Sequence, residues 1–148
     1  MKIPTRRLGI TVAFTVASIT GTACAWSPLG PSLAPFATSE SGYFQSGGIR
    51  LYYAFDLSEG VERPPVIVLS HGSERANADS DARFVLPLIQ RGFAVLRFDK
   101  RGVGKSGGMY SKATEQMTLQ AGDLVAAVDF LKGDPRIDPS RIGLMGPS

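Results

Sequence analysis

The sequence contains very little of the chemistry from which metal centres and disulfide frameworks are built. Its 148 residues include one cysteine, Cys24, and one histidine, His71. A lone cysteine has no partner for an internal disulfide, and one histidine among scattered carboxylates lacks the ligand spacing of a metal site. We therefore expect neither a metal ion nor another cofactor.

Most of the chain also lacks an excess of either charge. The formal net charge is +3, but Lys2, Arg6 and Arg7 are the only charged residues before residue 26. Without these three of the 16 Lys and Arg residues, 13 remain, equal in number to the 13 Asp and Glu residues. We therefore expect that residues 26–148 attract neither nucleic acid nor an anionic membrane.

The apolar stretch near the N-terminus runs from Leu8 to about Ile19. It is too short to span a bilayer comfortably. A basic start precedes this stretch, and Ala23-Cys24-Ala25 after it fits the small-x-small rule for cleavage. Residues 1–25 are therefore predicted to be a signal peptide of a periplasmic or secreted protein. The alternatives are a short N-terminal membrane anchor and a lipid on Cys24, although Gly21 stands where such lipid sites usually have leucine.

Composition divides the remaining chain into a linker and one domain. Residues 26–42 are rich in Pro, Ser, Gly and Ala, which predicts a linker or an extended arm. Residues 43–148 are predicted to form the domain. Its first elements are two β segments at 43–46 and 49–56, and Gly47-Gly48 between them is a hairpin signal.

Apolar strands alternate with helices after this hairpin. Strands are predicted at 66–69, 93–98 and 142–145, and helices at 82–90 and 114–132, where apolar residues recur every three or four positions. This alternation implies right-handed crossovers and a mostly parallel sheet, with the hairpin as its antiparallel edge. The predicted fold class is α/β.

A glycine-containing motif follows each of the three parallel strands. These are His71-Gly72-Ser73, then Asp99-Lys-Arg101-Gly102-Val-Gly104-Lys-Ser106, and finally Gly146-Pro147-Ser148. Ligands of open α/β sheets bind at the carboxyl ends of the strands, so we expect the motifs to meet there. The last motif matches the start of Gly-x-Ser-x-Gly, in which a nucleophilic serine sits on a tight strand-to-helix turn.

The middle motif also fits two nucleotide-binding patterns. Gly102-x-Gly104-x-x-Gly107 has dinucleotide spacing, but that pattern should open a helix at once, and the next predicted helix begins near residue 114. Gly104-Lys-Ser resembles the end of a phosphate-binding loop, whose first glycine would fall on Asp99. We expect instead a tight polar turn in which Asp99 and Arg101 bond the loop backbone and each other.

Taken together, the motifs resemble the α/β-hydrolase superfamily, near the exported bacterial prolyl oligopeptidase, dienelactone hydrolase and acyl-CoA thioesterase types. The resemblance covers about residues 43–148 and implies the N-terminal half of that fold. It implies Ser148 as nucleophile and the backbone N–H of Ser73 as an oxyanion donor. His71, with Gly72, would support that loop. One departure is Pro147, where many relatives have histidine.

The resemblance also defines what is absent. The triad of this fold runs in the order Ser, then Asp or Glu, then His, whereas His71 precedes Ser148. We therefore expect a serine hydrolase for a small-molecule or peptide substrate with an ester, thioester or amide bond, truncated and inactive as given. The alternatives are a non-catalytic binding module or degenerate hydrolase and, behind these, a nucleotide-binding protein.

Overall fold

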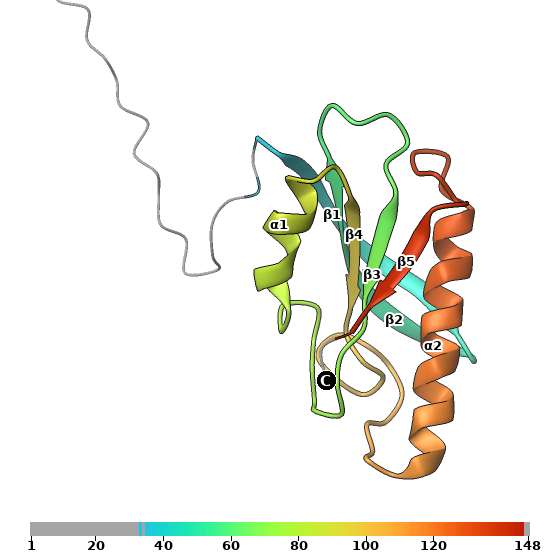
Figure 1. Ribbon diagram of the computed structural model, residues 1–148. Coiled ribbons are helices and arrows are strands. Elements are labelled where there is room, and N and C mark those ends of the chain that lie inside the picture. The colour runs from blue at the N-terminus through green and yellow to red at the C-terminus, as the bar shows by residue number, and fades with distance from the viewer. Residues whose placement is uncertain (1–32, 34, 147–148) are drawn as a thin grey trace, which may run out of the picture.

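The structure is a computed structural model that describes residue 33 and residues 35–146. The predicted signal peptide 1–25, Cys24 within it, and Pro147 and Ser148 lie outside the described residues. The described part contains a five-stranded mixed sheet in the order β1-β2-β4-β3-β5, with α1 and α2 on opposite faces (Figure 1). The predicted α/β class, with an antiparallel hairpin before parallel strands, is confirmed.

The hairpin joins β1 (Ala37–Ser46) to β2 (Ile49–Ser58) in a continuous antiparallel register. Gly47 and Gly48 have φ values of 53° and 80°, as a two-residue hairpin turn with two positive φ angles requires. Residues 37–42, which composition placed in the linker, are instead the first part of β1. Their polar sequence has no apolar alternation, so only their pairing with β2 reveals the strand.

Three parallel strands follow: β3 (Val66–Leu69), β4 (Ala94–Phe98) and β5 (Ile142–Met145). β4 pairs antiparallel with β2 and parallel with β3, and β3 pairs parallel with β5. β4 is buried throughout, which explains its uninterrupted apolar character apart from one arginine. The sheet therefore has its centre at β4 and β3.

One predicted helix divides in two and the other is confirmed. The segment predicted as a helix at 82–90 is a 3-10 turn, η1 (Ala82–Phe84), followed by α1 (Val85–Ile89). Pro87 lies in the first turn of α1, where its missing N–H has no helical partner to lose. α2 spans Thr114–Lys132, the range that its periodicity predicts.

Two apolar layers hold the helices on the sheet. The layer under α2 includes Phe55, Leu96 and Leu131, and the layer under α1 includes Leu69, Val85, Ile89 and Val95. Burial decreases toward β5, where Leu144 is 59% exposed. Within the described ranges, neither helix is long and apolar enough to cross a membrane.

Candidate active site

The carboxyl ends of the three parallel strands lie side by side, as predicted. Leu69, the last residue of β3, is in register with Met145, the last residue of β5. The next backbone N–H, that of Ser70, donates to the Met145 carbonyl oxygen at 2.8 Å. A Cβ placed on Gly146 would lie 3.6 Å from Ser70. The residue before the first motif and the first residue of the last motif therefore lie in direct contact.

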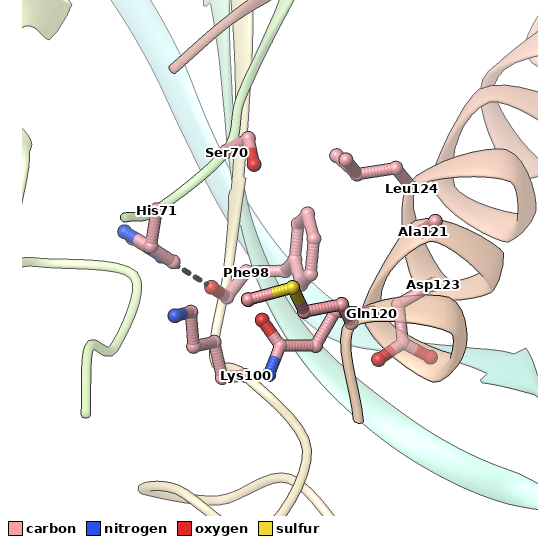
Figure 2. Close-up of a pocket in the computed structure, with 9 residues that line it drawn as sticks. Ser70, His71, Phe98, Lys100, Gln120, Ala121, Asp123 and Leu124 are labelled. Atoms are coloured by element: carbon pink, nitrogen blue, oxygen red, sulfur yellow. Dashed lines mark hydrogen bonds between the residues drawn. The ribbon is translucent and has the colours of Figure 1, made fainter. Parts of the chain in front are cut away.

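His71 fastens its loop to the neighbouring strand. Its Nε2 lies 2.9 Å from the Phe98 carbonyl oxygen, which can only accept, so Nε2 carries a proton (Figure 2). Its Nδ1 lies 3.0 Å from Asp81 Oδ2, and the imidazole side chain is 1% exposed. Both ring nitrogens are engaged, so His71 anchors the loop to β4 and to Asp81.

Two side chains of the loop after β4 bind three carbonyl oxygens of the loop after β3. Lys100 Nζ donates to the carbonyl oxygens of Gly72 and, at 2.9 Å, of Glu74. Tyr110 Oη donates to the Ser73 carbonyl oxygen at 2.6 Å. The described residues supply no acceptor for the Ser73 N–H, the predicted oxyanion donor. Sequence reasoning missed Lys100 and Tyr110, because lysine is ordinarily a surface residue and neither side chain has a periodic or motif signal for this role.

Asp99 joins the loop after β3 to the middle motif. Its Oδ1 accepts the N–H of Ala78 and its Oδ2 accepts the N–H of Lys105, both at 2.7 Å. Ser106 Oγ donates to the Asp99 carbonyl oxygen at 2.7 Å and accepts the Tyr52 N–H at 2.9 Å. The predicted bonding of Asp99 to loop backbone is confirmed, and the Ser106 hydroxyl links the loop to β2.

Arg101 does not bond Asp99, so that part of the prediction is wrong. The Asp99 carboxylate is already occupied by two backbone N–H groups, and Arg101 points toward α2 instead. There its Nε and Nη2 bind the carboxylate of Asp123 at 2.8 and 2.7 Å. Ser46 Oγ, from the hairpin, donates to Asp123 Oδ1 at 2.6 Å. The buried pair therefore joins the motif, α2 and the hairpin turn.

The glycines of the middle motif are needed by the turn itself. Gly102 and Gly104 have φ values of 68° and 56°, which favour glycine. A Cβ on Gly102 would overlap the backbone of Met109 and Tyr110, and one on Gly104 would overlap the Asp99 carboxylate. No helix opens directly after Gly107, since α2 begins at Thr114. The arrangement is a tight polar turn and differs from the dinucleotide pattern.

A cleft of about 230 Å³ opens between the loop after β3 and the N-terminal half of α2 (Figure 2). It is lined by Ser70, His71, Phe98, Lys100, Met117, Gln120, Ala121, Asp123 and Leu124. Burial lowers the pKa of the Lys100 ammonium below its ordinary value of 10.5, and the nearby Glu74 carboxylate offsets only part of this change. The cleft is thus apolar over much of its wall, with one buried cation.

A mixed sheet of this strand order, with an antiparallel hairpin before the parallel strands and these motifs at their carboxyl ends, is the N-terminal half of an α/β-hydrolase fold. Residues 47–148 match the family described as X-Pro dipeptidyl-peptidase (S15 family), and the chain belongs to this family of hydrolases. The match includes all three motifs.

Individual relatives cover similar parts of the chain. Thiohydrolase aneE from Aspergillus aculeatus is 32% identical over 115 residues, 74% of this chain and 34% of that protein. Hypothetical protein PA2218 from Pseudomonas aeruginosa has a similar structure, with a TM-score of 0.67 and 26% identity over 92% of this chain and 40% of that chain. Est1E from Butyrivibrio proteoclasticus, solved with ferulic acid bound, has a TM-score of 0.63 and 25% identity over 72% and 42% of the two chains. The chain spans 24–35% of the length of the curated relatives that it matches.

Proposed function

We propose that the protein is a serine hydrolase that cleaves an ester, thioester or amide bond, with Ser148 as the nucleophile. The hydrogen bond from the Ser70 N–H to the Met145 carbonyl oxygen carries this proposal, because it brings the end of β5 against the loop that bears Ser73. Two residues of chain span at most about 7.6 Å, so a serine two residues after Gly146 stays within reach of that loop.

The chemistry follows from these positions. The Ser148 hydroxyl oxygen attacks the carbonyl carbon of the substrate while a general base takes its proton. The Ser73 N–H and the N–H of the residue after Ser148 stabilise the oxyanion. The leaving group departs with the proton, and water then hydrolyses the acyl-enzyme.

The base and its acid are proposed to follow Ser148 in the complete protein. His71 has both ring nitrogens engaged, and the triad of this fold places the acid and the histidine after the serine. The relatives that match are much longer than this chain. We therefore propose that activity requires a base supplied from beyond residue 148.

The cleft beside Ser70 fits the same proposal. A right-handed connection after β5 to a further strand beyond it would place the next helix on the α2 face of the sheet. Met117 is 64% exposed and Leu144 is 59% exposed on that side. We propose that the start of a helix following Ser148 fills the cleft and covers these apolar side chains.

The relatives differ in the type of bond or ligand that their names indicate, so we propose no single type of bond. One is a thiohydrolase, another, Est1E, was solved with ferulic acid bound, and the family is described by a dipeptidyl-peptidase activity. Thioesters, esters and amides share the carbonyl carbon and the oxyanion that this site would handle. We propose a small-molecule or peptide substrate.

We also propose that the protein is exported, with cleavage after Ala25. The basic residues before Leu8 and the apolar stretch after it support this location. Mass spectrometry of the exported protein should find Trp26 at its N-terminus. An intact Met1, or a lipid on Cys24, would contradict cleavage after Ala25 and indicate a membrane anchor instead.

The test uses the protein expressed from its complete reading frame. A fluorophosphonate probe should label Ser148, and Ser148→Ala should abolish labelling and lower turnover by about four to six orders of magnitude with little change in stability. Ser73→Ala is the matched control, because it keeps the backbone N–H and should retain activity within a few-fold. Labelling that persists in Ser148→Ala would move the nucleophile elsewhere, and an unreactive wild-type protein would favour the non-catalytic binding module.

A further inference from the structure

We propose that Lys100 is a positioning residue of the oxyanion hole, because its ammonium group holds the Gly72–Ser73 peptide unit with the N–H directed away from Lys100 and toward the reacting carbonyl. The inference rests on the proposed hydrolase function and goes beyond it, since Lys100 belongs neither to the triad nor to the oxyanion donors.

The contacts of the ammonium group define this role. Lys100 is 4% exposed, and its Nζ donates to the carbonyl oxygens of Gly72 and Glu74. Tyr110 Oη holds the intervening carbonyl oxygen of Ser73. Three successive carbonyl groups are therefore bound by side chains of the loop that follows β4.

Peptide geometry converts this binding into an orientation. The C=O of Gly72 and the N–H of Ser73 belong to one trans peptide unit and point in opposite directions. Glycine offers little resistance to rotation of that unit, because it has no Cβ. Binding of the Gly72 oxygen by Lys100 therefore fixes the direction in which Ser73 presents its N–H.

The choice of an ammonium group also has an electrostatic reason. Lys100 takes part in none of the ion pairs formed among the described residues, and its ammonium group is bound by two backbone carbonyl oxygens. An ordered cation in a poorly solvated site favours negative charge that develops nearby. The same group thus orients the donor and favours the oxyanion that the donor binds.

The experiment compares Lys100→Met with Lys105→Met in the protein expressed from its complete reading frame. Lys105 lies in the same loop, but its Nζ sits 4.1 Å from the centre of the Tyr52 ring, so it is a matched control for charge. The readouts are kcat and KM for p-nitrophenyl acetate and the inhibition constants of a short alkyl trifluoromethyl ketone and of the corresponding methyl ketone. The fluorinated ketone forms a tetrahedral oxyanion with the serine, whereas the methyl ketone binds largely unreacted.

Lys100→Met should lower kcat and the affinity for the trifluoromethyl ketone about 10- to 100-fold, whereas KM and the methyl ketone change less than about threefold. Lys105→Met should resemble wild type. Lys100→Gln retains two N–H donors without the charge, so its losses of kcat and of trifluoromethyl ketone affinity should be smaller. If Lys100→Met does not fold, Lys100→Gln tests the inference by the same criteria.

Two results would overturn the inference while leaving the hydrolase proposal intact. One is a folded Lys100 variant with wild-type kcat, and the other is an equal loss of affinity for both ketones, which would indicate general damage to the site. A wild-type protein that neither turns over the ester nor reacts with a fluorophosphonate would overturn the hydrolase proposal itself, and this inference with it.

Discussion

The two outer strands of the described sheet, β1 and β5, differ in composition. β1 is a ten-residue outer strand whose first part is polar, and every residue pairs with β2. β5 is a four-residue strand of Ile, Gly, Leu and Met that pairs only with β3 in the described sheet. Natural outer strands carry polar and charged residues that discourage further pairing. β1 therefore has the composition of an edge, whereas β5 has the composition of an interior strand.

The polar groups near the hairpin also differ from those near the end of β5. On the hairpin side, charged groups are paired with one another, as in Arg101 with Asp123 and Arg136 with Glu40. On the β5 side, the described residues supply no acceptor for the Ser73 N–H, and the cleft opens beside Ser70. The buried Arg101–Asp123 pair therefore links α2 to the hairpin, whereas the proposed chemistry belongs to the carboxyl ends of the parallel strands.

The largest expected effect is the loss of a folded state when residues 26–148 are expressed alone. Without cover, β5 and the apolar residues of α2 such as Met117 stay in water, and a domain has only about 5–15 kcal/mol of stability to lose. We expect aggregation and no cooperative transition in thermal and urea unfolding. A soluble monomer with a sharp two-state melt would show that the β5 side needs no further cover.

On the hairpin side, Asp123→Ala should destabilise the complete protein by about 3–5 kcal/mol, because it leaves the buried Arg101 guanidinium without a partner. Urea unfolding measures the change. The double variant Arg101→Met with Asp123→Leu removes both charges and should cost clearly less. Equal losses in the single and double variants would argue against an unpaired charge as the cause.

One substitution on each side tests the comparison directly. Leu144→Lys on β5 should cost the complete protein at least about 2 kcal/mol if a further helix covers that face, since a lysine would then be buried. Gln45→Lys on the exposed face of β1, opposite Arg50, should cost less than about 1 kcal/mol. Similar small effects at both positions would mean that β5 is an outer strand in the complete protein.

The smallest effect concerns a surface network and depends on pH. Hydrogen bonds from Arg136 lower the pKa of Glu40 and of Asp134 below their ordinary values of 4.5 and 3.8. A lowered carboxyl pKa stabilises the folded state above the ordinary value, and this contribution disappears as the pH falls through the lowered value. Arg136→Met should therefore cost at most about 1 kcal/mol at pH 7, and the difference from wild type should shrink in acid. A difference that stays constant with pH would assign the effect to packing.

Much of the fold could be predicted because its signals are local. The range of α2 follows from a repeat of apolar residues every three or four positions, and the hairpin turn follows from two glycines that tolerate positive φ. The apolar runs at 66–69 and 142–145 identify strands of a parallel sheet. The meeting of the first and last motifs follows from this topology, since parallel strands carry their next residues to the same edge.

The hydrogen-bond, ion-pair and strand-pairing partners depend on the folded structure and could not be predicted from the local sequence. Residues 37–42 form a strand because β2 pairs with them, although their own pattern predicts a linker. Arg101 binds Asp123 because Asp99 is occupied by backbone N–H groups, and Lys100 is buried where its ammonium group binds carbonyl oxygens of the loop after β3. Periodicity and turn chemistry act over a few residues and can be read along the chain, whereas partner choice depends on the competition among groups brought together by distant segments.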